Sequence, residues 1–346
     1  MVTRIVLSDI WGLAMRERIL ITGGAGFIGL HLARSLVARG AHVTLIDNFF
    51  RGSLDQDLQV LRSNMNLIEH DLTQPLPEQV VVGDYTQVYH LAAVVGVRYS
   101  NDMPHIVMRT NLLATLNLLD WCREGKHLTL CFASTSEAYA GSVTLNYAPI
   151  PTPEDVPLTL PDLNIPRASY AASKIVGEQL CLNYARAFGF SLRIVRYHNI
   201  YGPRMGYEHV IPQFIRRLLE RQNPFHLYGA WQSRAFCYVD DAVEATLQLM
   251  DLPGVEPLTV NIGNDREEIQ IVDLAHKLFP IVGFSPELSI YPPPLGSPER
   301  RCPDLERLRH LTDYEPKVAL ERGLWQTFEW YKRDWERQGD TAGKYK

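Results

Sequence analysis

Two short motifs could do chemistry together, one near the start of the chain and one at its middle. In the first, Gly23, Gly26 and Gly29 follow a short apolar run. In the second, Tyr170 and Lys174 are the ends of the run Tyr-Ala-Ala-Ser-Lys. A glycine-rich turn lets the backbone approach a pyrophosphate, and a tyrosine beside a lysine can exchange a proton. In this order the two motifs predict an enzyme that uses a nicotinamide cofactor.

The cofactor site is expected at the turn between the first strand and the first helix, where the helix N-terminus offers free N–H groups. Asp47 ends the next predicted strand, where a carboxylate can hold ribose hydroxyls and repels a 2′-phosphate. NAD is therefore favoured, although the nearby Arg51 keeps NADP open. The other residues predicted to line this site, besides the two motifs, are Phe27, Ile28, Asn48, Asp71, Leu72, Leu91, Ala92, Ala93, Ser134 and Tyr197. Of these, Asp71 could instead lie in a solvated turn.

The catalytic residues are expected at the start of a helix and at the end of a strand. Tyr170 and Lys174 share one helix face, so that Lys174 can lower the pKa of the tyrosine and bind the nicotinamide ribose. Thr135, Ser136 and Glu137 follow the fifth predicted strand. The carboxyl ends of parallel strands are where open α/β sheets build active sites. These five side chains are the predicted catalytic set.

The elements that must position these residues alternate along the chain. Short β-branched runs are separated by helical patterns, which predicts an α/β fold with a parallel sheet wound on both faces. A proline-rich stretch over 143–168 is expected to be a long loop. The expected strands are 19–22, 42–46, 66–69, 87–91, 128–133, 191–196 and 258–262, and the clearest helices are 27–38, 106–122 and 170–188.

The domain boundaries follow from composition. We expect an N-terminal extension over 1–17, a cofactor-binding domain over 18–200, and a tail over 336–346. Residues 201–335 are expected to form a smaller substrate-binding lobe, partly interleaved with the sheet. No signal peptide is predicted at the N-terminus.

Composition excludes several function classes. The chain has 346 residues, 46% of them hydrophobic, and a formal net charge of -5, which argues against general affinity for nucleic acid. No apolar run is long enough to span a membrane. The five cysteines have no paired or metal-binding spacing, so we expect buried thiols, no metal site and a cytoplasmic location.

Further motifs make the chain resemble the extended short-chain dehydrogenase/reductase family. They are the Thr-Ser-Glu after the fifth strand, Arg196–Arg204, Ser233–Phe236, Val260–Asn264 and Arg301–Asp304. The resemblance covers about Arg18 to about Tyr331 and implies a Rossmann fold. The family includes nucleotide-sugar epimerases, dehydratases and UDP-glucuronate decarboxylases.

The resemblance implies a shared mechanism, in which tightly bound NAD oxidises the C4 hydroxyl of a sugar and later returns the hydride. Thr135 would hydrogen-bond the C4 oxygen beside Tyr170. Asn111 would brace the active-site backbone, and Asn199 would contact the cofactor and the substrate diphosphate. The remaining residues implied in substrate binding are Arg204, Tyr228, Arg234 and Arg301.

Glu137 is expected to discriminate between net reactions. A 4-epimerase needs no carboxylate there, whereas Thr-Ser-Glu resembles the decarboxylases and some dehydratases. The run Tyr-Ala-Ala-Ser-Lys is commoner in epimerases and dehydratases. Decarboxylation is favoured; 4-epimerisation and dehydration stay open, as do a dehydrogenase that releases NADH and a non-catalytic NAD-binding protein.

The partners implied by the resemblance are a nucleotide sugar, with UDP favoured, and a second copy of the chain. The helices expected over 106–122 and 170–188 would form the homodimer interface. Neither the sugar nor the pathway follows from the sequence.

Overall fold

The computed structural model describes residues 17–125, 127–294 and 296–343. The N-terminal extension predicted for 1–17 therefore lies outside the described residues, except for Glu17. Regular structure begins with β1 (Arg18–Thr22), and the first helix, α1 (Phe27–Ala38), has the bounds expected from the sequence.

The centre of the molecule is a seven-stranded parallel sheet in the order β11-β6-β5-β4-β1-β2-β3. The chain leaves β1 for β2 and β3 at one edge and then returns to place β4 on the other side of β1. The carboxyl ends of β1 and β4 thus flank the point where the strand order reverses, which is where open α/β sheets bind ligands. The strands after β1 are β2 (His42–Asp47), β3 (Met65–Glu69), β4 (Gln87–His90), β5 (Thr129–Thr135), β6 (Ser191–Tyr197) and β11 (Leu258–Ile262).

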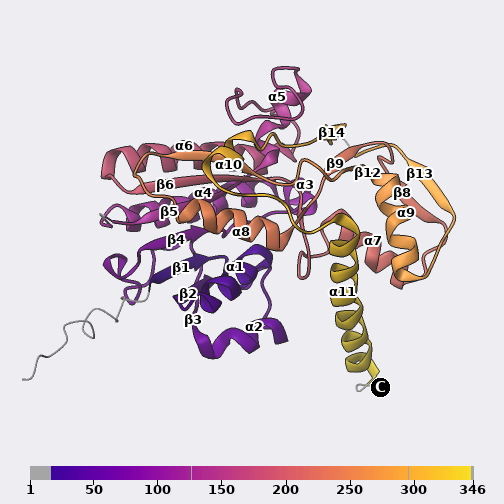
Figure 1. Cartoon of the computed structure of the whole chain (residues 1–346), viewed down its shortest axis with the longest axis horizontal. Helices are drawn as coiled ribbons and strands as arrows, with labels where there is room; N and C mark the ends of the chain where they lie inside the picture. The colour runs from indigo at the N-terminus through magenta and orange to yellow at the C-terminus, as the bar shows by residue number, and fades with distance from the viewer. Residues whose placement is uncertain (1–16, 126, 295, 344–346) are drawn as a thin grey trace, which may run out of the picture.

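Helices cover both faces of this sheet, as expected for a doubly wound fold (Figure 1). Ile19 and Ile21 of β1 belong to one apolar core, which includes residues of α1 and α8 (Val239–Met250). Leu20 between them belongs to a second core with residues of α4 (Pro104–Cys122) and α6 (Ala168–Phe188). The alternation follows from the two-residue repeat of a strand. The short helices α2 (Gln56–Leu61), α3 (Val97–Asp102) and α5 (Ala140–Thr144) lie in the connections.

A smaller lobe lies beside the sheet (Figure 1). Its short strands form three small sheets, which pair β10 with β7, β13 with β8, and β9 with both β12 and β14. The lobe is interleaved with the main domain, because α8 and β11 return to the large sheet. The last helix continues past residue 335, where a separate tail was predicted, to Gly343. The elements are β7 (Ile200–Tyr201), α7 (Val210–Leu219), β8 (Phe225–Tyr228), β9 (Ser233–Ala235), β10 (Cys237–Tyr238), β12 (Glu268–Gln270), α9 (Ile271–Val282), β13 (Leu288–Tyr291), β14 (Arg300–Arg301), α10 (Glu306–Leu311) and α11 (Leu320–Gly343).

A buried ion pair joins the catalytic helix to the sheet. Arg196 at the end of β6 donates to both carboxylate oxygens of Glu178 in α6, at 2.9 and 2.6 Å. Glu178 also accepts a hydrogen bond from Ser134 of β5. Arg196 donates in addition to the Tyr139 hydroxyl and the Glu154 carbonyl, at 2.7 and 3.1 Å. Both charges are therefore fully hydrogen-bonded, the condition under which a buried pair is tolerated.

Arg196→Met should destabilise the fold by about 3 kcal/mol, because it leaves the buried Glu178 carboxylate without its cation. Equilibrium unfolding in urea measures the change. Arg216→Met is the matched control, since Arg216 forms an exposed ion pair with Glu220 in α7 and should cost no more than about 0.5 kcal/mol. Similar losses in the two variants would contradict the assigned importance of the buried pair.

Candidate active site

One cavity of about 610 Å³ runs from the glycine turn to the catalytic motif and on to the small lobe. It brings together residues that are far apart in the sequence and lie at the carboxyl ends of β1, β4, β5 and β6, at the start of α6, and in the lobe. The site residues predicted from the sequence that line it are Gly23, Gly26, Phe27, Ile28, Gly29, Leu91, Ala93, Ser134, Thr135, Ser136, Glu137, Tyr170, Lys174, Tyr197, Asn199, Arg204, Tyr228, Arg234 and Arg301.

The glycine turn has room only for glycine at two of its positions. Gly23 has a φ of +68°, and a Cβ there would lie 2.7 Å from the backbone nitrogen of Ala92, at the end of β4. A Cβ at Gly29 would collide with the carbonyl oxygen of Gly23. The turn is thus pressed against the end of β4 while α1 begins after Gly26, with no side chain over its first N–H groups. This cradle fits the pyrophosphate of a dinucleotide.

Asp47 lies behind the turn and holds it. Its carboxylate accepts hydrogen bonds from the backbone nitrogens of Ala25 and Phe49, at 3.0 and 2.8 Å. Burial raises the pKa of Asp47, while these two hydrogen bonds and Arg204 oppose the rise. The carboxylate supports the loop that would carry the adenosine ribose, and its contact with that ribose stays a prediction.

Arg204 lines the cavity and also contacts the glycine turn. Its guanidinium donates to Asp55 at 2.6 Å and to the carbonyl oxygens of Ala25 and Gly26, both at 3.2 Å. Arg204 therefore braces the turn, and its contact with the substrate stays a prediction.

Four residues predicted near the cofactor are engaged in local structure. Asn48 and Asp71 each accept a hydrogen bond from the backbone two residues ahead, at 3.1 and 2.9 Å. Leu72 is buried, and its carbonyl accepts from Asn117 at 2.8 Å. Ala92 meets Gly23. None of the four is among the residues that line the cavity, so their contact with the adenosine stays a prediction.

The predicted catalytic residues meet at the centre of the cavity. Tyr170 is hydrogen-bonded to Thr135, and Lys174 donates to the carbonyl of Ala133 at 2.8 Å. Burial lowers the pKa of Lys174 to about 8. Burial, reinforced by Glu137, raises the pKa of Tyr170, although Thr135 and Arg51 oppose the rise. In the chain without its cofactor, the pKa of Tyr170 is therefore raised and not lowered as expected, because desolvation outweighs the nearby positive charge.

Asn111 braces the backbone beside the catalytic residues. Its side chain accepts from the Val94 nitrogen at 2.7 Å and donates to the Val94 carbonyl and the Ser173 hydroxyl, at 3.2 and 3.1 Å. Val94 follows β4, and Ser173 precedes Lys174. The amide therefore ties the end of β4 to the catalytic helix.

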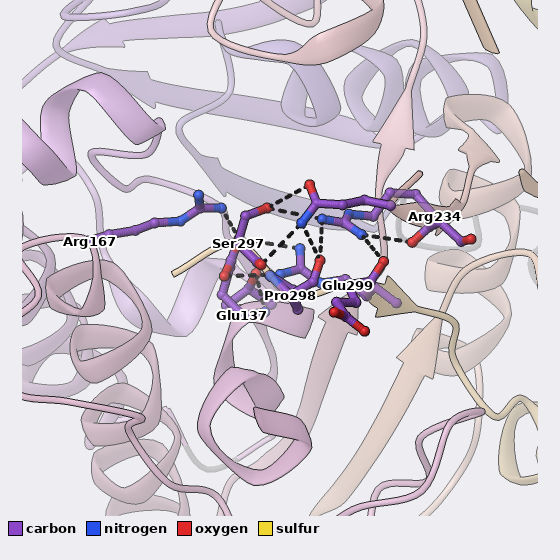
Figure 2. Close-up of polar contacts among 10 residues, drawn as sticks. Glu137, Arg167, Arg234, Ser297, Pro298 and Glu299 are labelled. Carbon is purple, nitrogen blue, oxygen red and sulfur yellow. Dashed lines mark hydrogen bonds and ion pairs between the residues drawn. The ribbon is translucent and has the colours of Figure 1, made fainter. Parts of the chain in front are cut away.

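Glu137 is held between two arginines (Figure 2). Arg167 donates to its Oε1 at 3.3 Å, and Arg301 lies 3.2 Å from Oε1 and 3.1 Å from Oε2. Burial alone would raise the pKa of this carboxyl, but the two guanidinium groups outweigh it and lower the pKa to about 2. Glu137 is therefore a carboxylate at any physiological pH and a weak base.

The lobe supplies Arg234, Tyr228 and Asn199 to the same cavity. Arg234 is fixed by the carbonyls of Ser233, Glu299 and Pro298 and by the Ser297 hydroxyl. Burial, helped by Arg301, lowers the pKa of Arg234 to about 9. Tyr228 stacks on Tyr291, with ring centroids 5.1 Å apart, and Asn199 donates to the Ala235 carbonyl at 3.0 Å.

Sequence reasoning assigned no role to several residues that line the cavity. Arg51 served in the sequence analysis only as a ground for keeping NADP open, and Arg167 received no role. The segment before α7 contributes further residues whose types gave no motif. These lining residues are Arg51, Ser100, Arg167, Glu208, His209, Gln213, Arg217, Gln232 and Ser297.

The described residues hold no group of three or more His, Cys, Asp or Glu side chains arranged to bind a metal ion. No described helix is both long and apolar enough to cross a membrane.

Comparisons with known proteins agree on one family. The model of the NAD-dependent epimerase/dehydratase family matches residues 19–263. UDP-N-acetyl-α-D-glucosaminuronate decarboxylase from Bacillus cytotoxicus is 37% identical, over 92% of this chain and 98% of that protein. UDP-glucuronic acid decarboxylase 1 from Xenopus tropicalis is 36% identical, over 94% of this chain and 74% of that protein.

Solved structures give the same picture. UDP-glucuronic acid 4-epimerase from Bacillus cereus, in complex with UDP-glucuronic acid and NAD, has a TM-score of 0.78 and 29% identity, over 91% of this chain and 99% of that one. UDP-glucose 4-epimerase from Thermotoga maritima, with UDP-glucose, has a TM-score of 0.79 and 30% identity, over 92% and 99%.

Gly29→Ala should weaken NAD binding at least about tenfold, because the added Cβ would push the turn away from the pyrophosphate position. Calorimetry on the NAD-free protein measures the affinity. Gly83→Ala is the control, since a Cβ at Gly83 meets nothing within 4 Å. Unchanged affinity in the Gly29 variant would remove this turn from the NAD site.

Proposed function

The chain belongs to the NAD-dependent epimerase/dehydratase family, as its sequence motifs predicted, and from that premise we propose that it decarboxylates a UDP-linked uronic acid. It is an enzyme, and its cofactor is NAD. The observation that carries the proposal is the double ion pair of Glu137 with Arg167 and Arg301. The names of two curated relatives, both decarboxylases, support the same reaction class.

Dehydration needs a base that takes the C5 proton of the sugar. Glu137 is the carboxylate in the sugar end of the cavity suited to that task by position, but with a pKa of about 2 it is poorly suited to accept a proton. Decarboxylation needs no such base, because the electron pair reaches C5 from the breaking C5–C6 bond. The ion-paired state of Glu137 thus favours loss of carbon dioxide over loss of water.

The residues have the following roles in the proposed mechanism. Bound NAD supplies a hydride acceptor for C4 and the hydride that is later returned. Tyr170 takes the proton of the C4 hydroxyl, and Thr135 holds the same oxygen. When the C5–C6 bond breaks, carbon dioxide leaves and the electron pair spreads from C5 to the C4 oxygen, where Thr135 and Tyr170 stabilise it. C5 then takes up a proton.

Lys174 would hold the nicotinamide ribose beside Tyr170. Arg234 and Arg301 would hold the diphosphate, for which fixed guanidinium groups are well suited. The Tyr228 ring would lie near the uracil.

A 4-epimerase acting on a uronic acid is the second candidate. The residues from Tyr170 to Lys174 read Tyr-Ala-Ala-Ser-Lys, a sequence that is commoner in epimerases and dehydratases. The Bacillus cereus structure that holds UDP-glucuronic acid and NAD has a similar fold. The same tyrosine, threonine and lysine would serve both reactions. The two reactions differ in whether the sugar keeps its carboxylate, which epimerisation retains and decarboxylation removes.

We also propose a cytoplasmic homodimer. The five cysteines are buried free thiols, as is usual for proteins of a reducing compartment.

Ile106 in α4 and Val176 in α6 are 36% and 42% exposed although both are apolar, and these two helices pack together. A second pair of the same helices would cover them. Sedimentation at micromolar concentration would test the dimer.

Incubation of the NAD-loaded protein with UDP-glucuronate and UDP-N-acetylglucosaminuronate, followed by mass spectrometry, should reveal loss of carbon dioxide from one of them. Tyr170→Phe should abolish the reaction while NAD stays bound, because the C4 oxygen loses its proton acceptor. Unchanged mass with a shifted chromatographic peak would select epimerisation, and loss of water would select dehydration.

Glu137→Gln should lower kcat without moving the acidic limb of the pH profile between about pH 4 and 7. The pKa of Glu137 is lowered to about 2, so its carboxylate and both ion pairs persist throughout this range and are lost only as the pH falls toward 2. The control is Glu220→Gln, whose exposed carboxylate lies immediately after α7. An acidic limb that is present in the native enzyme and disappears in the Glu137 variant would identify Glu137 as a base after all.

A further inference from the structure

Arg167 enters the cavity from the wall opposite to the other two guanidinium groups. It is the residue immediately before α6 and lies three positions before Tyr170, so it belongs to the catalytic wall. Arg234 and Arg301 come from β9 and β14 of the lobe, where they are directly paired in register. Figure 2 shows Arg167 on one side of Glu137 and the cluster around Arg234 on the other.

The three arginines differ in how fully they are engaged. Arg234 donates to four acceptors within the lobe, and Arg301 faces both carboxylate oxygens of Glu137. Arg167 makes one hydrogen bond among the described residues, to an oxygen that Arg301 already shares. Its side chain is only 17% exposed. The rest of its guanidinium therefore faces the cavity with donors to spare.

The charge at this end of the cavity is unbalanced. Three guanidinium groups surround the single carboxylate of Glu137. The Nη2 atom of Arg301 is buried and has no acceptor in hydrogen-bonding geometry. A nucleotide diphosphate, with two negative charges, would balance the two arginines of the lobe, and Glu137 balances the charge of Arg167. A further anion would therefore be held by the donors of Arg167 that Glu137 leaves unused.

We propose that Arg167 is a specificity-determining residue that binds the sugar carboxylate and so selects UDP-linked sugar acids over neutral UDP-sugars. The inference rests on the proposed function and identifies the side chain that distinguishes an acidic UDP-sugar from a neutral one. A guanidinium offers a carboxylate two parallel, charge-assisted hydrogen bonds. A neutral hydroxymethyl group offers neither the charge nor the second acceptor, and it leaves donors of the guanidinium without acceptors in a partly buried site. Glu137 keeps Arg167 oriented, and the donors that Glu137 does not use are the ones offered to the sugar carboxylate.

Calorimetry on the NAD-loaded Tyr170→Phe protein, which is expected to bind the acid without converting it, should test this with three ligands: UDP-glucuronate, UDP-glucose and UDP. The variants below are made in this background. Arg167→Gln should weaken the binding of UDP-glucuronate at least about tenfold and leave the other two within about twofold, because only the acid uses the guanidinium. Arg167→Lys should recover part of the loss, since it restores the charge without the planar fork. Arg98→Gln, in an exposed pair with Asp102, is the control and should change none of the three affinities.

Equal loss for all three ligands would assign Arg167 to the nucleotide or to the fold, and an unchanged ratio between acid and neutral sugar would equally overturn the inference. The product assay separates this from failure of the proposed function. A native enzyme that prefers the acid through Arg167 but only epimerises it would refute decarboxylation and keep the inference. Decarboxylation with an unchanged binding ratio in Arg167→Gln would do the reverse.

Discussion

The buried pair of Glu178 and Arg196 is the interaction on which the active site most depends. It ties α6 to β5 and β6, and through Tyr139 and Asn261 it continues to β11. Every element that presents a predicted catalytic side chain is attached to this network or directly adjacent to it. A charge pair of this kind is tolerated because all its hydrogen-bonding groups are satisfied, and this requirement fixes the geometry. The distance between the end of β5 and the first turn of α6 is therefore set by the interior of the protein.

A second constraint acts at the cofactor end. The glycine turn and the end of β4 touch through backbone atoms, because no side chain separates Gly23 from Ala92. Asp47 holds the turn from behind, and Arg204 holds it from the lobe. The two ends of the cavity are thus built by different physics. Close backbone packing forms the end that would receive the dinucleotide, and a cluster of partly buried arginines forms the end that would receive the sugar.

The fold was largely predictable from the sequence, because strands buried on both faces and amphipathic helices leave clear periodic patterns. The bounds of α1 were predicted without error, and the other main strands and helices were placed within a few residues. The short strands of the lobe, such as β9 and β14, were not predicted, since two or three residues carry no period. The residues predicted for the centre of the site line one cavity, because glycine, tyrosine and lysine at fixed spacing encode a specific geometry. The contact of Arg204 with the glycine turn was not predicted, because its partners, Asp55 and the turn carbonyls, are about 150 or more positions away in the sequence. Arg167 received no role because a single arginine before a helix carries no spacing signal.

The contact of Arg204 with the glycine turn has a consequence for redesign of the enzyme. Arg204 belongs by sequence to the lobe, yet its guanidinium donates to carbonyl oxygens of the turn that would receive the dinucleotide. The lobe is therefore not an independent module that can be exchanged at a boundary near residue 200. A chimera that grafts the lobe of a relative onto this sheet must carry over both the arginine and its anchor, Asp55. Without these two residues, the chimera would lose the contacts that hold the glycine turn from the side of the lobe.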